Sequence, residues 1–292
     1  MKGDGELLNM RIGIFDNLAN NAYSLAKIFR KKGYKADLLL DYFDTFPMSQ
    51  PLWEDCDFSI SADLLMKKQL TKEYWEKKSF ELGWEKPIWI KEVRRRGRKG
   101  ILLNMLFHPF KNLHSLRKLG KYGPLFLCSC EPIHREMKTY DVMITFGLGP
   151  IYAFFGNVPF IHYPYGGDLT LVPFQRNYLG SLQRRALTNV KYIIVGDPGY
   201  LDYLKKLGID SKAKFIPFMI NTEVYKPIPK MQAMNALDDD LHHKVQNKFI
   251  FFVPSRQDFI WKGSDKMLMA FAKVVQKRKD VFMILSGWGN DL

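Results

Sequence analysis

The stretch MRIGIFDNLANNAYSLAKIFRKKGYKADLLL, residues 10–40, decides the fold class. Residues 10–15 form a short apolar run that predicts a buried strand, and residues 36–40 form a second one. Between them, residues 22–32 place apolar side chains at helical spacing and stop at Gly33, a residue that commonly ends helices. A strand, a helix and a strand within about thirty residues predict a βαβ unit, which opens a doubly wound parallel sheet.

The same alternation returns after residue 139. Apolar runs predict strands at residues 140–146, 158–163, 191–195 and 214–217. Helical spacing begins at residues 151–155 and covers residues 179–187 and 200–207. Residues 41–139 interrupt the alternation and are interpreted as an insertion, irregular and rich in Pro and Trp over residues 41–90 and basic after that.

A second unit is expected near the end of the chain. Strand 249–253, helix 264–277 and strand 281–285 predict one further βαβ unit. The polar tract that precedes it, up to Lys248, is expected to be an inter-domain crossing. We therefore expect an α/β protein with a Rossmann-like domain over residues 1–228 and a partial second one over residues 229–292.

Composition excludes several classes of protein. The 292 residues are 47% apolar and 25% charged, which is globular composition and excludes a wholly disordered chain. No run of eighteen apolar residues predicts a membrane-spanning helix, and the N-terminus MKGDGELLNM lacks the apolar core of a signal peptide. Three cysteines without a C-x-x-C motif predict neither a disulfide framework nor a zinc site, which indicates the cytoplasm.

Positive charge is concentrated in one segment. The chain carries 44 Lys and Arg against 30 Asp and Glu, a net charge of +14. Residues 91–121 contain ten of these bases and one acid, and enclose the apolar run 101–107. One interpretation is an interfacial segment on an anionic membrane; the other is a solvated basic loop that leads into a core helix. Nucleic acid is not expected as a partner, because no binding motif for it is present.

Two loops follow predicted strands where parallel sheets bind ligands. Residues 16–21 lack G-x-G-x-x-G, which disfavours a dinucleotide site of the dehydrogenase kind. The asparagines of this loop either contact an anion or a sugar hydroxyl, or cap the following helix. In the loop Tyr165-Gly166-Gly167-Asp168, the glycines permit close approach of a ligand. Asp168 is either a base and hydrogen-bond acceptor or the cap of a turn.

A third loop, residues 254–263, follows the first strand of the second unit. Arg256 and Lys262 flank this strand-to-helix turn, a suitable place for a cationic clamp on a diphosphate. No catalytic triad, carboxylate pair or spacing of metal ligands stands out, so no metal site is predicted.

These motifs resemble the retaining "group 1" glycosyltransferases of the GT-B fold. Residues 251–256 (FFVPSR), 261–263 (WKG) and 284–287 (ILSG) resemble the start of that family's C-terminal domain. Residues 216–227 (IPFMINTEVYKP) are similar to its inter-domain crossing, and residues 164–169 (PYGGDL) to its His-Gly-x-Asp loop.

The resemblance implies transfer of a sugar from a UDP- or GDP-sugar to an acceptor hydroxyl, with no bound metal or other cofactor. It assigns Arg256 and Lys262 to the departing diphosphate, and Asn20 and Asn21 to the donor phosphates. It makes Asp168 the catalytic acid on the acceptor side. The candidate acceptor-side residues are Asn17, Tyr165, Gly166 and Gly167.

The resemblance also implies where the enzyme works. The acceptor would be a glycan or glycolipid, lipid-linked or at the membrane surface, and segment 91–121 would face it. The protein would be cytoplasmic or peripheral on the inner face of the membrane. Only one βαβ unit of the second domain precedes Leu292, so we expect a truncated C-terminal domain that lacks two donor-binding glutamates. The alternative function is a non-catalytic module that binds a glycan or a membrane surface.

Overall fold

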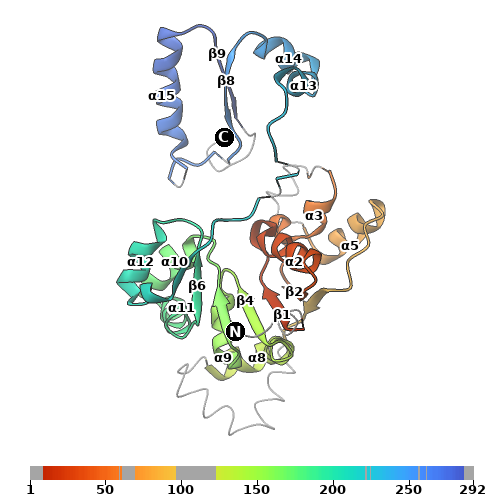
Figure 1. The fold of residues 1–292 in the computed structure, drawn as a ribbon, viewed down its shortest axis with the longest axis vertical. Coiled ribbons are helices and arrows are strands. Elements are labelled where there is room, and N and C mark those ends of the chain that lie inside the picture. Colours follow the sequence, from red (N-terminus) through yellow and green to blue (C-terminus); the bar gives the residue numbers. More distant parts are fainter. Residues whose placement is uncertain are drawn as a thin grey trace. The chain divides into compact units, whose positions relative to one another are not determined.

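Seven parallel strands form the sheet of the first part of this computed structural model (Figure 1). The order β3-β2-β1-β4-β5-β6-β7 is that of a doubly wound fold, which confirms the α/β prediction. The strands are β1 (Arg11–Phe15), β2 (Lys35–Asp41), β3 (Ile90–Val93), β4 (Val142–Thr145), β5 (Phe160–His162), β6 (Tyr192–Val195) and β7 (Ala213–Phe215).

The structure describes residues 9–58, 60, 70–96, 123–220, 222–223, 225–255, 257–260 and 262–285. The chain divides into two compact units, Met1–Met219 and Ile220–Leu292. The sequence-based boundary lies at residue 228, because the run 216–227 was assigned whole to the first domain.

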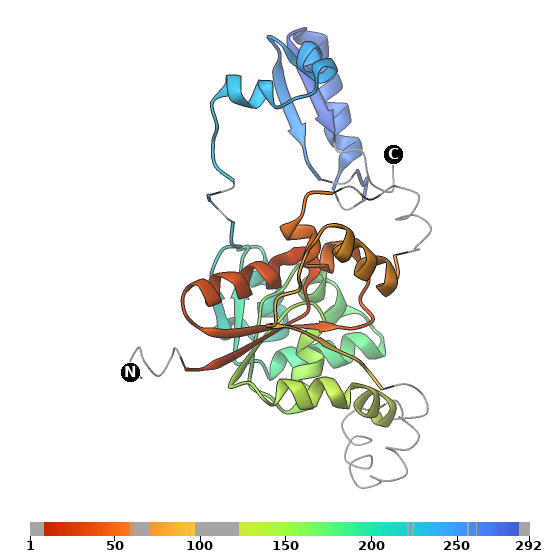
Figure 2. The ribbon, with the colours of Figure 1, turned by 90° about the vertical axis from the view of Figure 1, so that its right-hand side faces the viewer.

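The helices of the first unit cover both faces of its sheet. They are α2 (Asn21–Lys31), α3 (Leu52–Asp55), α5 (Lys72–Glu81), α8 (Gly123–Met137), α9 (Gly149–Gly156), α10 (Gly167–Thr170), α11 (Tyr178–Thr188) and α12 (Tyr200–Leu207). Short 3-10 turns are η1 (Leu18–Asn20), η2 (Pro47–Ser49), η4 (Val172–Phe174) and η5 (Asp210–Lys212). Figure 2 shows α2 on one side of the strands and α8 and α9 on the other.

Alternation along the strands separates two hydrophobic cores. Ile12 and Ile14 of β1 pack with Ala22 and Ala26 of α2. Phe15 faces the opposite side, in the core that α8, α9, α11 and α12 cover. Because both faces are covered, the strands are apolar on both sides, as a parallel sheet requires.

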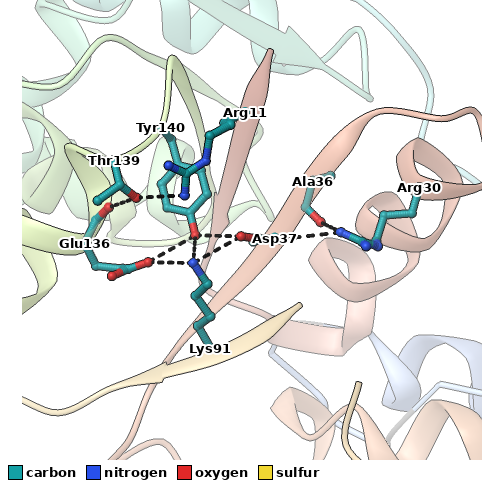
Figure 3. A network of polar contacts seen from close by, with 8 residues as sticks. All are labelled: Arg11, Arg30, Ala36, Asp37, Lys91, Glu136, Thr139 and Tyr140. Carbon is teal, nitrogen blue, oxygen red and sulfur yellow. Dashed lines mark hydrogen bonds and ion pairs between the residues drawn. The ribbon is translucent and has the colours of Figure 1, made fainter. Parts of the chain in front are cut away.

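A polar network ties three strands to α8 (Figure 3). Lys91 Nζ lies 3.2 Å from Asp37 Oδ2, 2.9 Å from Glu136 Oε1 and 2.9 Å from the Tyr140 hydroxyl. The Arg11 guanidinium lies over the Tyr140 ring, 5.1 Å from its centroid. Burial lowers the pKa of Lys91, but its hydrogen bonds to Tyr140, Glu136 and Asp37 outweigh burial and hold that pKa above its ordinary value. The network therefore connects β1, β2 and β3 with α8.

Segment 41–139, interpreted as an irregular insertion, contributes regular structure. It contains α3, α5, β3 and α8, and β3 is an edge strand of the sheet. Helix α5 escaped sequence analysis because Trp75 is its one buried side chain, so it shows no apolar stripe. Helix α8 contains Pro132, which argues against a helix in a sequence. The insertion is thus part of the first domain's fold.

The second unit has the predicted strands and helix. Strands β8 (Phe249–Val253) and β9 (Val281–Leu285) are parallel and are joined by α15 (Ser264–Lys277). The polar tract contains two short helices, α13 (Lys230–Asn235) and α14 (Asp239–Val245), so it is not a simple crossing. Asp238 caps α14 by accepting a hydrogen bond from the Leu241 amide at 2.9 Å. In the described parts of the chain, no helix has the length and apolar character to cross a bilayer.

Candidate functional site

The candidate site lies where the sheet changes its winding direction. Strands β1 and β4 are neighbours, and the connections that leave them run toward opposite edges. Open parallel sheets bind ligands outside the carboxyl ends of such strands. The loop after β1 and the loop after β4 therefore form the expected binding place.

Asp16 is the first residue after β1 and was missed by the sequence analysis. Its backbone has φ 75°, and its Oδ1 accepts a hydrogen bond from the Asn17 amide at 2.8 Å. Its Oδ2 lies against Gly147, in the loop after β4, where a Cβ would overlap it. Gly147 also has φ 51°, so two separate constraints favour glycine there. Asp16 and Gly147 thus join the two loops.

The pKa of Asp16 is raised to about 7. Burial is the largest cause, and the nearby carboxylates of Asp44, Asp168 and Asp41 raise the pKa further. The hydrogen bond from the Asn17 amide opposes them in part. A carboxyl group with a pKa near 7 exchanges a proton readily at neutral pH, as a general acid or base must.

The asparagines of the loop after β1 make hydrogen bonds within the first unit. Asn17 is fully buried; its Nδ2 donates to Ser49 O at 2.9 Å, and its Oδ1 accepts from the Tyr23 amide at 2.8 Å. Asn20, in a left-handed conformation, donates to Gln50 O at 3.2 Å. Asn21 makes only an exposed contact of 3.4 Å with Leu18 O. Of the three, Asn21 is the most accessible to a ligand, and Asn17 satisfies the first turn of α2.

Asp168 organises the loop after β5. Its Oδ1 accepts hydrogen bonds from the Tyr165 amide at 3.0 Å and the Gly166 amide at 2.8 Å. Gly166 has φ 138°, a conformation that only glycine adopts easily. Gly167 begins α10 and is exposed. The structure therefore brings Tyr165, Gly166, Gly167 and Asp168 together, with the Asp168 carboxylate turned onto its own loop.

His162, at the end of β5, also reaches Asp168. Its Nδ1 lies 2.9 Å from Thr145 O, and its Nε2 lies 3.3 Å from Asp168 Oδ2 without hydrogen-bond geometry. The ring is fully buried. Since β4 and β5 are neighbours, the Thr145 carbonyl orients the His162 ring, which lies beside the Asp168 carboxylate. The sequence did not place His162 in the site.

Three buried polar atoms beside this loop have no hydrogen-bond partner within the described residues: His162 Nε2, the Tyr165 hydroxyl and Gln183 Oε1. The Tyr165 ring stacks on Phe146 at 4.9 Å, and burial together with Asp16 and Asp168 raises its pKa. Gln183 Nε2 donates to Gly147 O at 3.2 Å and to Asp168 O at 3.1 Å. An unsatisfied buried polar atom favours binding of a water or ligand group. The Tyr165 ring and the Gln183 amide therefore lie beside Gly147, which contacts Asp16.

The predicted diphosphate clamp lies in the second unit. Lys262 is exposed in the turn before α15, where its backbone amide donates to Asp258 O at 3.0 Å. Arg256 lies outside the described residues. Among the residues that the structure describes, no group of three or more His, Cys, Asp and Glu side chains is arranged to hold a metal ion.

The described bases of the basic segment contact partners within the protein. Lys91 belongs to the network of Figure 3, Arg94 lies over the Tyr42 ring, and Arg96 pairs with Glu131 at 2.6 Å. Arg95 donates to Asp41 at 2.7 Å. Residues 97–122, which hold the rest of the segment and its apolar run, lie outside the described residues.

Comparison with known proteins defines the fold. No protein-family model matches the chain, and no curated protein matches it significantly. The solved structure of Anabaena Alr3699/HepE in complex with UDP-glucose is similar, with a TM-score of 0.55 at 16% identity over 95% of this chain and 60% of that one. The N-terminal domain of Candida albicans trehalose-6-phosphate phosphatase has a TM-score of 0.53 at 13% identity, over 98% of this chain and 66% of that one. The fold is of the GT-B type.

The GT-B-type fold agrees with the fold that the sequence motifs predicted. The chain spans about 60% of the length of HepE. The compared structures include a second HepE complex, with UDP and glucose, at a TM-score of 0.53. At this level of identity the likeness establishes the arrangement of strands and helices, and the site residues come from the geometry above.

Proposed function

We propose that this protein is a glycosyltransferase that moves a sugar from a UDP- or GDP-sugar to an acceptor hydroxyl. The GT-B-type fold supports the proposal, as do the HepE structures that hold UDP-glucose or UDP and glucose. The observation that carries it is Asp16, a carboxyl group with a pKa of about 7 at the winding-direction change of the sheet.

The proposed reaction uses Asp16 as the proton acceptor. The acceptor oxygen bonds to the sugar carbon as the bond from that carbon to the diphosphate oxygen breaks. The acceptor proton passes to Asp16, and the nucleoside diphosphate leaves with the electron pair. In this proposal Arg256 and Lys262 neutralise the diphosphate, and Asn20 and Asn21 keep the donor-phosphate role that the sequence resemblance implies.

Asp168 serves the acceptor side in this proposal. With Tyr165, Gly166, Gly167 and Asn17 it shapes the place where the acceptor hydroxyl binds. Its hydrogen bonds to the Tyr165 and Gly166 amides support a positioning role. The anomeric configuration of the product, read by NMR, separates two routes. Inversion supports Asp16 as the base, whereas retention, which the sequence resemblance implies, sends the proton to the departing phosphate.

Calorimetric titration with UDP, GDP, UDP-glucose and GDP-mannose tests the proposal. We expect saturable binding of one nucleotide series, lost in Arg256→Ala and kept in Lys266→Ala, an exposed lysine on α15. A folded chain that binds none of the four would contradict a nucleotide-sugar function and favour the non-catalytic module.

We also propose that segment 91–121 attaches the protein to an anionic membrane on its cytoplasmic side, near a glycan or glycolipid acceptor. Because Lys91, Arg95 and Arg96 pair with acids of the protein, the attraction would come from residues 97–121. Co-sedimentation with vesicles tests this. Binding to phosphatidylserine vesicles but not to phosphatidylcholine vesicles is expected, and equal binding to both would refute the electrostatic attachment.

A further inference from the structure

A cavity in the first unit is lined by residues other than those of the candidate site. It occupies about 230 Å³ between α5, the segment after η2, and the strands β2 and β3. A water molecule takes about 30 Å³ of liquid volume, so the cavity has room for a single-ring ligand. Drug-sized ligands need about 300–1,000 Å³ and would not fit. We call it the insertion pocket, because its helix and one of its strands come from segment 41–139.

Apolar side chains form part of the lining of the insertion pocket. Leu40 and Ile90 contribute from the sheet, and Trp75 and Trp84 contribute indole rings. The Trp75 Nε1 donates to Thr45 O at 3.0 Å, and the Trp84 Nε1 donates to Asp55 Oδ2 at 3.0 Å. Both indole N–H groups thus have partners. The Trp84 ring is partly exposed and offers apolar carbon surface to a ligand, whereas Trp75 is 3% exposed and packs with Trp84 in the core.

The polar side chains of the lining have balanced charge. Lys72 and Lys86 lie 2.5 Å and 3.3 Å from the same oxygen of Glu92, Oε1. Burial by itself raises the pKa of Glu92, but the hydrogen bond and charge of Lys72 and the charge of Lys86 hold it below its ordinary value. Glu76 and Ser79 of α5 also line the pocket. Two lysines and two glutamates leave no net charge, and they offer both donors and acceptors.

The mixed apolar and charged lining selects the chemistry of a ligand. An ion would find no net opposite charge, and a hydrocarbon would desolvate four charged side chains without replacing their hydrogen bonds to water. A pyranose ring combines an apolar face of C–H groups with a rim of hydroxyls that donate and accept. We propose that the insertion pocket binds one neutral pyranose residue, with its apolar face on the Trp84 indole and its hydroxyls toward Glu76, Glu92 and Lys86.

The insertion pocket is connected to the loop after β1. Gln50 lines the pocket, and its carbonyl oxygen accepts the hydrogen bond from Asn20 Nδ2. The neighbouring Ser49 carbonyl accepts the hydrogen bond from Asn17 Nδ2. The segment of Ser49 and Gln50 therefore connects the pocket with Asn17 and Asn20, which follow Asp16 in the loop after β1. Binding of the sugar does not depend on the proposed function, although its use as part of an acceptor would.

Tryptophan fluorescence and saturation-transfer NMR test the inference on the full chain. The probes are the methyl glycosides of glucose, galactose, mannose and N-acetylglucosamine, with inorganic phosphate and cyclohexanol as charged and apolar controls. We expect saturable binding of at least one glycoside and no dependence on salt, because the ligand is neutral. The expected variant effect is a loss of about fivefold in affinity for Glu76→Ala, the size of one lost hydrogen bond.

Two variants and one control make the test decisive. Glu76 is exposed, so Glu76→Ala will fold, and Ser79→Phe fills the cavity and should abolish binding. Lys77→Ala, on the exposed side of α5, should bind like the wild type. The inference is overturned if no glycoside binds, if phosphate or cyclohexanol binds instead, or if the glycoside binds both pocket variants unchanged. Nucleotide binding is measured separately, so its failure leaves this result intact.

Discussion

Replacing Asp16 by asparagine should stabilise the protein, and the gain should grow with pH. The native carboxyl has a pKa of about 7 against an ordinary value of 3.8, so the folded protein binds the proton more tightly than the unfolded chain. For an acid with a raised pKa, the ionised form is the costly one. The wild type therefore loses stability as the pH rises from about 4 to about 7, and Asp16→Asn does not.

The size of the gain follows from the two pKa values. One pH unit corresponds to about 1.4 kcal/mol, so the difference between 3.8 and about 7 sets an upper limit of about 4 kcal/mol. Asp16 keeps partial contact with solvent, which lowers the cost of its charge. We expect a gain of about 1–3 kcal/mol at pH 8 and about zero at pH 4. Asparagine tolerates φ 75° and retains the oxygen that accepts from the Asn17 amide.

Urea unfolding at several pH values measures the gain. Asp202→Asn is the control. Asp202 is exposed and lies 3.8 Å from Lys205 in a surface ion pair, so its replacement should change the free energy of unfolding little at any pH. A difference between wild type and Asp16→Asn that stays constant from pH 4 to pH 8 would refute the buried-charge reasoning. If Asp16 is the base, the stabilised variant should also lose transfer activity, the usual trade of stability against function.

Three further predictions concern single residues. Gly147→Ala should destabilise by about 1–3 kcal/mol in thermal unfolding, because its Cβ meets Asp16 Oδ2 at a positive φ; an equally stable variant would contradict the close contact. Lys91→Met should lower the free energy of unfolding by about 1–2 kcal/mol at pH 7, because Asp37 and Glu136 lose their shared partner. The loss should be the same from pH 6 to pH 9, where Lys91 stays charged, and a loss that changes with pH would argue against this reasoning. Lys262→Ala should weaken UDP binding about tenfold in calorimetry while Lys266→Ala does not, and equal affinities would remove Lys262 from the diphosphate clamp.

Much of the fold could be predicted because the local spacing of apolar residues indicates most of its strands and helices. Strand β1 and helix α2 show clear periodicity, and β8, α15 and β9 lie within one residue of the predicted ranges. The misses have local causes as well. Helix α5 is polar on nearly every side and depends on its Thr71 cap and surface ion pairs, and β3 has only four residues. The two short helices α13 and α14 resemble a polar linker in composition.

The candidate site was predicted only in part, because its members meet across strands. The loops after β1 and β5 were identified from their polar residues and glycines. Asp16 lies against Gly147 because β1 and β4 pair in the sheet. Their register pairs Ile12 with Val142, which are 130 positions apart in the sequence. His162 reaches Asp168 for the same reason, since β4 and β5 are neighbours.

The sequence by itself determined the class of this protein: a parallel α/β sheet, a second βαβ unit and motifs that resemble GT-B glycosyltransferases. Such properties depend on the spacing of apolar residues and on glycine and proline, which act within one or two turns of chain. Only the tertiary structure decided that burial raises the pKa of Asp16 to about 7, that Asn17 is buried, and that the described residues of segment 41–139 contribute a strand, helices and most of a pocket lining. Burial, charge proximity and cavities are sums over neighbours distant in sequence, so they exist only once the chain has folded.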